Sequence, residues 1–312
     1  MSNYIDQYAR LLVEYCLEIK SGQKLLIQST TLGLPLVKKV YQHAFEKGAL
    51  IEYQLDFEGK DQIFRDFATK EQLQYIPELI QKAFTSFDAY LNIRAPFDLK
   101  SSIDLTPENN KIRFAAMEPF WDQYFQRTGN GEMKRTLCQF PTPTSAELAE
   151  MTLEEYEDFI HEACMLNHKN PIEAWKHLGQ KQQRIVDLLN TKTSFRYLNE
   201  HTDLTFTTRG RTWINSDGKA NMPSGEVFTA PEEDSVNGFI FFDYPLLYKG
   251  EEIEGIYLEV VKGYITKWKA QRGQHTLDKI MEIEGARRFG EAAIGTNYNI
   301  DRFTKNILFD EK

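Results

Sequence analysis

Two glutamates have the sequence surroundings of residues that could do chemistry. Glu226 stands between a glycine and the short β-prone run VFTA, and Glu291 follows a glycine in the stretch RRFGEAAIGTN. The chain has no G-x-S-x-G segment, so carboxylate chemistry is favoured over a serine nucleophile. A carboxylate can bind a divalent cation, but most glutamates are exposed surface acids. Residue type alone therefore leaves a metal ligand and a surface acid both open at these positions.

A second metal-like pattern occurs in the stretch HEACMLNH, where His161, Cys164 and His168 share one face of a predicted helix. Ligands of these types can bind zinc. Cys164 also continues an apolar stripe, and no fourth ligand follows nearby, so a structural role is favoured. The glycine-rich stretch RTGNGEMK lacks the spacing and the following helix of a phosphate-binding loop, and we interpret it as a loop.

The first part of the chain alternates buried strands with amphipathic helices. The strand candidates are KLLIQS, ALIEYQL and DAYLNI, and the helix LPLVKKVYQHAFEKG lies between the first two. Strands that alternate with helices predict right-handed crossovers and a parallel sheet covered on both faces. The fold class expected here is therefore α/β, with an N-terminal parallel-sheet domain.

The character of the sequence changes after a long predicted helix that runs from Asn170-Pro171 to about Leu189. Short alternating runs follow, including a hairpin predicted around Lys262-Gly263 and one helix from Leu277 to Phe289. We expect Glu226 at a strand end and Glu291 at the end of that helix. The predicted domains are an α/β domain over residues 1–190 and a β-rich α+β metal-binding domain over 191–312.

Composition excludes several functional classes. The chain has 312 residues, a net charge of −9 and a pI of about 5.3, so it carries no basic surface that would predict binding to nucleic acid. Asp6 and Arg10 interrupt the amino terminus where a signal peptide needs an apolar run, and no segment has the length of a membrane span. The three cysteines are far apart, which fits reduced thiols. These features predict a cytoplasmic protein with no membrane or nucleic-acid partner.

Several segments carry a specific resemblance to a known family. The stretches NMPSGEVFTAPEEDSVNG, EGARRFGEAAIGTN and the terminal LFDEK resemble the aminopeptidase T and aminopeptidase S family of metal-dependent, thermophilic-type aminopeptidases, which includes PepS. The segment YARLLVEYCLEIKSGQKLLIQS and the passage from MTLEEYEDFIHEAC to PIEAWKHL are similar to the same family in the same order. The resemblance therefore covers essentially the whole chain.

The resemblance implies a function and a site. It implies a metalloaminopeptidase that hydrolyses amino-terminal residues from peptides through a water activated by two divalent cations per subunit, which are Co, Zn, Mn or Mg. It places one metal ligand at Glu226 and a second at Glu291, which bridges the cations or serves the water in catalysis. It also implies peptide substrates and a homodimer.

One departure from the family pattern bears on activity. The family's histidine ligands, its catalytic tyrosine and its last histidine/aspartate pair lie downstream of LFDEK, and none of the six histidines of this chain stands in a matching motif. The expectation is a chain truncated at its carboxyl end, with an incomplete metal-binding domain and doubtful activity. The alternative is a non-catalytic truncated descendant that acts as a binding or interaction protein. Glu311, in the same terminal segment, is expected near the site and is assigned no role.

Overall fold

The computed structural model describes residues 2–98, 105–248 and 250–312, which form two compact units. The first unit comprises Met1–Ala174 and Gly218–Pro223, and the second comprises Trp175–Asp217 and Ser224–Lys312. Most of helix α9 (Pro171–Leu189) thus belongs to the second unit. The division at residue 190 stays a prediction.

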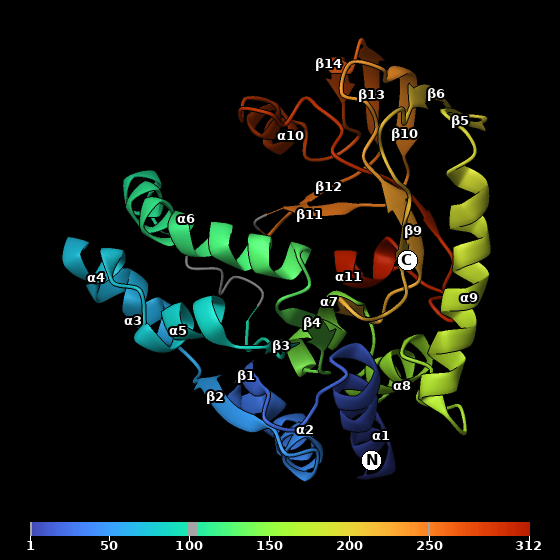
Figure 1. Ribbon diagram of the computed structural model, residues 1–312. Helices are drawn as coiled ribbons and strands as arrows, with labels where there is room; N and C mark the ends of the chain where they lie inside the picture. The colour runs from blue at the N-terminus through green and yellow to red at the C-terminus, as the bar shows by residue number, and fades with distance from the viewer. Residues whose placement is uncertain (1, 99–104, 249) are drawn as a thin grey trace. The chain divides into compact units, whose positions relative to one another are not determined.

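A parallel sheet forms the centre of the first unit (Figure 1), which confirms the α/β class expected there. Leu25, Leu26 and Ile27 of its strand β1 are fully buried, as an apolar strand in a sheet covered on both faces should be. The five strands lie in the order β2 (Leu50–Asp56), β1 (Lys24–Thr30), β3 (Ala89–Arg94), β4 (Lys134–Gln139), β8 (Asn221–Met222).

Helices surround this sheet, and their starts follow local capping chemistry. The Thr106 and Thr142 side chains accept hydrogen bonds from backbone N–H groups in the first turns of α6 and α7, and Thr152 forms a capping box with Glu155 at α8. Phe84 of α5 and Tyr124 of α6 pack on Tyr90 of β3. The helices are α1 (Ser2–Leu11), α2 (Leu34–Glu46), α3 (Lys60–Phe67), α4 (Lys70–Gln74), α5 (Glu78–Ser86), α6 (Pro107–Gly129), α7 (Pro143–Leu148) and α8 (Leu153–Ala163).

The cysteines and the HEACMLNH stretch have structural environments. All three cysteines are buried thiols that form no disulfide, and burial raises the pKa of Cys164 to about 12. Helix α8 ends at Ala163, so His168 lies beyond it. Cys164 contacts the Tyr8 hydroxyl, whereas His161 stacks on Tyr4 with the ring centroids 4.2 Å apart. The two side chains therefore face different neighbours, as a structural role requires.

The second unit is built mainly from antiparallel strands, in agreement with the β-rich region expected there. Lys262 and Gly263 both have positive φ, 48° and 72°, and make the predicted hairpin between β13 and β14. One sheet has the order β14 (Tyr264–Lys269), β13 (Ile256–Val261), β10 (Asn237–Phe242), β6 (Thr202–Thr207), β5 (Ser194–Asn199). A second has the order β15 (Ala292–Gly295), β9 (Glu226–Thr229), β7 (Ile214–Ser216), and β11 (Leu246–Tyr248) pairs with β12 (Glu251–Ile253).

Two further helices belong to this unit, and one of them corrects a prediction. Helix α10 (Gln274–Met281) ends at Met281 and not at Phe289. The Arg287 guanidinium accounts for this end, because it donates a hydrogen bond to the free Met281 carbonyl, and Gly285 adopts a φ of +83° outside the helical region. Glu291 is therefore not at a helix end. The short helix α11 (Ile307–Asp310) follows β15.

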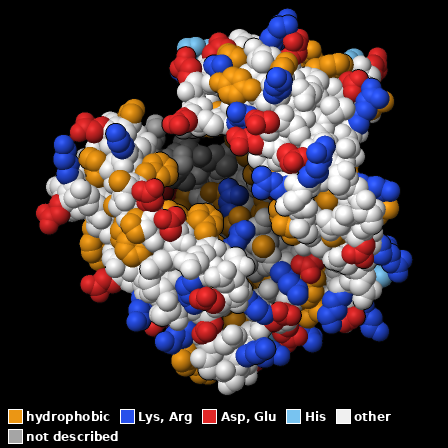
Figure 2. All heavy atoms as spheres, turned by 45° about the horizontal axis from the view of Figure 1, so that its top comes forward, with side chains coloured by type: hydrophobic (Ala, Val, Ile, Leu, Met, Phe, Trp, Pro, Cys, Tyr) orange, Lys and Arg blue, Asp and Glu red, His pale blue; other side chains and the backbone are white. Residues whose placement is uncertain are grey.

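The surface carries both signs of charge. Figure 2 shows Lys and Arg side chains interspersed with Asp and Glu on the face drawn, together with apolar groups. Within the part of the chain that the structure describes, no helix has the length and apolar character needed to cross a membrane.

Candidate metal centre

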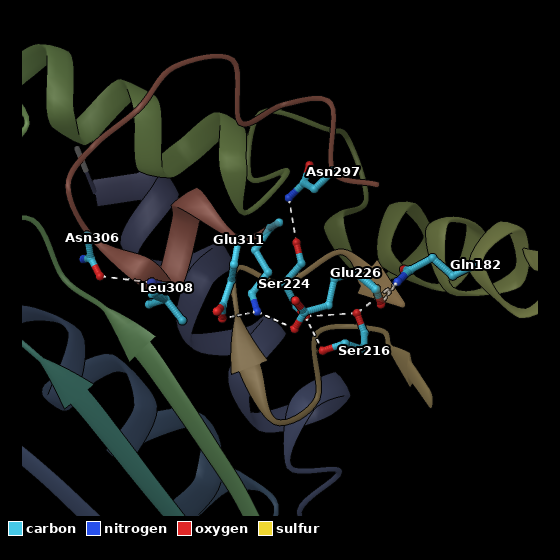
Figure 3. Close-up of polar contacts among 9 residues, drawn as sticks. Gln182, Ser216, Ser224, Glu226, Asn297, Asn306, Leu308 and Glu311 are labelled. Carbon is cyan, nitrogen blue, oxygen red and sulfur yellow. Dashed lines mark hydrogen bonds and ion pairs between the residues drawn. The ribbon is translucent and has the colours of Figure 1, made fainter. Parts of the chain in front are cut away.

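Glu226 is the first residue of β9, the central strand of the three-stranded sheet. It pairs with Ser216 of β7 on one side and with Gly295 of β15 on the other. The buried Gln182 side chain of α9 fixes this point, because its Nε2 donates to the carbonyls of Glu226 at 2.7 Å and Ser216 at 3.2 Å (Figure 3). The strand thus holds Glu226 at 5% exposure.

The glycine before Glu226 is required by a close approach of two backbones. Gly225 has a φ of +114°, and a Cβ there would lie 2.4 Å from Asn297 Cβ. Asn297 donates from Nδ2 to the Ser224 carbonyl at 2.9 Å, and the Thr296 N–H donates to the Gly225 carbonyl at 2.7 Å. The Ser-Gly-Glu sequence therefore lets the segment after β15 pack against the start of β9.

Glu291 directly precedes β15, which pairs antiparallel with β9. Unlike Glu226, it is exposed. In this register Ala292 lies opposite Thr229 and Gly295 lies opposite Glu226, so the backbone of Glu291 lies past the carboxyl end of β9. One of its carboxylate oxygens nevertheless lies within 4.8 Å of a Glu226 oxygen.

Glu311, to which the sequence assigned no role, is the third member of the cluster. It follows α11, where the Asn306 side chain caps the helix by accepting from the Leu308 N–H at 3.1 Å (Figure 3). Leu308 and Phe309 are buried and anchor this short helix. The sequence signals for this segment were the resemblance of LFDEK to the family and its apolar pair Leu308-Phe309, which lies two positions before Glu311.

The three glutamates converge. One carboxylate oxygen from each of Glu226, Glu291 and Glu311 lies within 4.8 Å of the other two, and Figure 3 shows Glu226 and Glu311 directed toward the same point. The Lys312 ammonium lies 2.5 Å from Glu226 Oε1 and 2.6 Å from Glu311 Oε1. The second Glu226 oxygen, Oε2, is buried and has no hydrogen-bond partner among the residues described.

The electrostatic environment of this carboxylate cluster favours the binding of a positively charged group. Burial raises the pKa of Glu226, while the hydrogen bond and charge of Lys312 oppose that rise. Although Glu291 is exposed as a residue, partial desolvation of its carboxyl group and, next, the charge of Glu311 raise its pKa. A buried carboxylate oxygen without a partner is unfavourable, and a hard divalent cation would satisfy it. The residues present therefore fit a divalent cation.

Converging carboxylates supply the oxygen ligands that divalent cations take in metal-dependent enzymes. The chain belongs to the Peptidase M29 family, described as thermophilic metalloprotease (M29), and the match spans residues 1–312. The resemblance found in the sequence is thereby confirmed, and the chain falls in a family of hydrolases.

Relatives over nearly the whole chain carry aminopeptidase names. Aminopeptidase 2 of Geobacillus stearothermophilus is 29% identical over 98% of this chain and 81% of its own length. Aminopeptidase AmpS of Bacillus subtilis is 29% identical over 99% of this chain and 80% of its own length. The solved structure of wild-type AmpT from Thermus thermophilus matches with a TM-score of 0.83 and 23% identity, over 99% of this chain and 83% of that one, and confirms the fold.

Proposed function

We propose that this chain is a metal-dependent aminopeptidase that hydrolyses the amino-terminal residue from peptides. Membership of a metalloprotease family and the aminopeptidase names of relatives along the whole chain support this function. The observation that carries it is the convergence of Glu226, Glu291 and Glu311 around a buried carboxylate oxygen that lacks a protein partner.

Glu226, Glu291 and Glu311 would hold the cations, two per subunit as the family resemblance implies. A divalent cation bound there would lower the pKa of a water molecule and polarise the scissile carbonyl. All three donors are carboxylates, which suit Mg and Mn best among the four candidate metals, although Zn and Co also accept oxygen ligands.

Glu226 and Glu291 differ in burial, and this difference suggests a different role for each. Glu226 is enclosed and held through its backbone by Gln182, which suits a fixed ligand. Glu291 is the exposed member of the cluster, so substrate and water can reach it. We therefore assign to Glu291 the catalytic role of accepting a proton from the attacking water. The partners in this proposal are peptide substrates and a second copy of the chain in a cytoplasmic homodimer.

Hydrolysis of leucine 4-nitroanilide tests the proposal. Activity should disappear with a chelator, return with added Mn²⁺ or Co²⁺, and be absent on the N-acetylated substrate. Glu291→Gln should abolish activity and keep the circular dichroism spectrum. The matched control is Glu284→Gln, an exposed glutamate of the same unit, which should leave activity unchanged. Full activity of Glu291→Gln, or activity that survives chelation, would overturn the proposal.

A further inference from the structure

We propose that Lys312 is a positioning residue of the metal centre, whose ammonium holds Glu226 and Glu311 in place when no cation is bound and competes with divalent cations for their oxygens. This inference rests on the proposed function, because it takes the carboxylate cluster to be a cation site. According to this inference, Lys312 sets how tightly the centre binds cations, although Lys312 is not itself a metal ligand.

The burial of Lys312 is the first observation. Its side chain has 0% exposure, whereas lysine is almost never fully buried unless it is paired. Its partners are two members of the carboxylate cluster, Glu226 at 2.5 Å and Glu311 at 2.6 Å. Hydrogen bonds between an ammonium and carboxylates are charge-assisted and therefore stronger than those between neutral groups. The ammonium therefore lies inside the cluster and joins two of its three carboxylates.

The backbone of Lys312 is also held. Its N–H donates to the Phe309 carbonyl at 3.0 Å, and its carbonyl accepts from the Asn297 N–H at 3.2 Å. The same carbonyl packs against Gly295, where a Cβ would lie only 2.4 Å from the Lys312 carbonyl oxygen. The ammonium therefore stays near the cluster unless the side chain changes rotamer or the backbone shifts.

The two oxygens of Glu226 have different environments. Oε1 accepts from Lys312, whereas Oε2 is buried without a partner in the described residues. A cation that binds Oε2 therefore comes close to an ammonium of the same sign, and repulsion between like charges in a buried site weakens its binding. Without a cation, the same ammonium relieves the repulsion among the carboxylates. Removal of the Lys312 charge should thus strengthen the binding of a cation and destabilise the protein when no cation is bound.

Lys312→Met tests this inference through affinity and melting temperature, without an activity assay. Mn²⁺ binding is measured by isothermal titration calorimetry, and thermal melting is followed with a chelator and with saturating Mn²⁺. Lys312→Met should bind Mn²⁺ at least tenfold more tightly than the wild type and melt at a lower temperature in chelator. The control is Lys267→Met, which removes the same charge from a largely exposed ion pair with Glu259. It should change Mn²⁺ affinity less than twofold.

The outcomes separate the inference from the proposed function. Unchanged or weaker Mn²⁺ binding by Lys312→Met, with wild-type binding intact, would overturn the inference and leave the proposed function standing. Absence of Mn²⁺ binding in both proteins would overturn both. If Lys312→Met does not fold in chelator, Lys312→Gln takes its place, because its amide removes the charge but can still donate a hydrogen bond to Glu226. Tighter Mn²⁺ binding by that variant would support the inference.

Discussion

The backbone of Gly295 packs directly on the backbone of Lys312, so that a Cβ on Gly295 would lie 2.4 Å from the Lys312 carbonyl oxygen and 2.7 Å from its carbonyl carbon. Real Cβ atoms do not approach backbone so closely, and one segment must move. Gly295 thereby links the end of β15 to the segment that carries Glu311 and Lys312.

Gly295→Ala should therefore displace Glu311 and Lys312 from the cluster. We expect a loss of about 1–3 kcal/mol of unfolding free energy, the usual range for overpacking, and Mn²⁺ binding weakened at least tenfold. Gly290→Ala is the control, because a Cβ there meets no atom within 4 Å. Chemical denaturation and calorimetry measure the two effects. If the two variants have the same unfolding free energy and the same Mn²⁺ affinity, the contact between Gly295 and Lys312 has no influence on the site.

Gln182 should matter for stability through the carbonyls that it satisfies. Gln182→Leu keeps the approximate volume but removes the donor that the Glu226 and Ser216 carbonyls share. The Ser216 carbonyl still accepts from the Ser224 hydroxyl and the Gly225 N–H, so the loss falls mainly on the carbonyl of the buried Glu226. The expected loss is about 1–3 kcal/mol of unfolding free energy. The exposed Gln180, on the same helix, supplies the control Gln180→Leu, for which we expect about 0.5 kcal/mol or less. Urea denaturation of both variants checks this, and a neutral Gln182→Leu would contradict it.

Glu18 should stabilise the first unit to an extent that depends on pH. Its hydrogen bond with Lys134 lowers the pKa of the Glu18 carboxyl, burial opposes this, and the charge of Lys219, whose ammonium lies 3.7 Å away, lowers it further. A carboxyl whose folded-state pKa lies below its unfolded value stabilises the fold above the unfolded pKa, about 4.3. That contribution disappears as pH falls through the folded-state pKa.

Glu18→Gln should consequently lower the unfolding free energy at pH 7 by about 1 kcal/mol or less, because the carboxylate is half exposed. The difference from the wild type should shrink as pH falls below about 4. Urea denaturation at pH 7 and at successively lower pH values measures it. A difference that grows toward acid pH would contradict the claim that folding lowers the pKa of Glu18.

Local sequence patterns predicted the elements that depend on local physics. The strand run KLLIQS became β1, in which Leu25, Leu26 and Ile27 are fully buried, and Lys262-Gly263 formed its hairpin, because apolar runs and turn residues act within a few positions. The two-residue strand β8 could not be predicted in this way. It joins the parallel sheet only through its pairing with Leu137 and Cys138, more than 80 residues earlier.

The same distinction applies to the candidate site. Glu226 and Glu291 were predicted because glycines and β-prone runs flank them and because their segments resemble a family motif. Lys312 could not be predicted to lie among them, since its contact with Glu226 spans 86 residues. The end of α10 was misplaced for a different reason, because it depends on the Arg287 side chain, which lies only six positions away but returns to bind the Met281 carbonyl.

The most direct measurement of the central claim is Mn²⁺ binding by the wild type and by three single variants, Glu226→Gln, Glu291→Gln and Glu311→Gln, in parallel with Glu284→Gln. If one centre is formed by the three carboxylates, each of the three variants weakens Mn²⁺ binding at least tenfold, and Glu284→Gln binds as the wild type does. Wild-type affinity in Glu226→Gln or Glu311→Gln would contradict the claim that these carboxylates form a single metal centre.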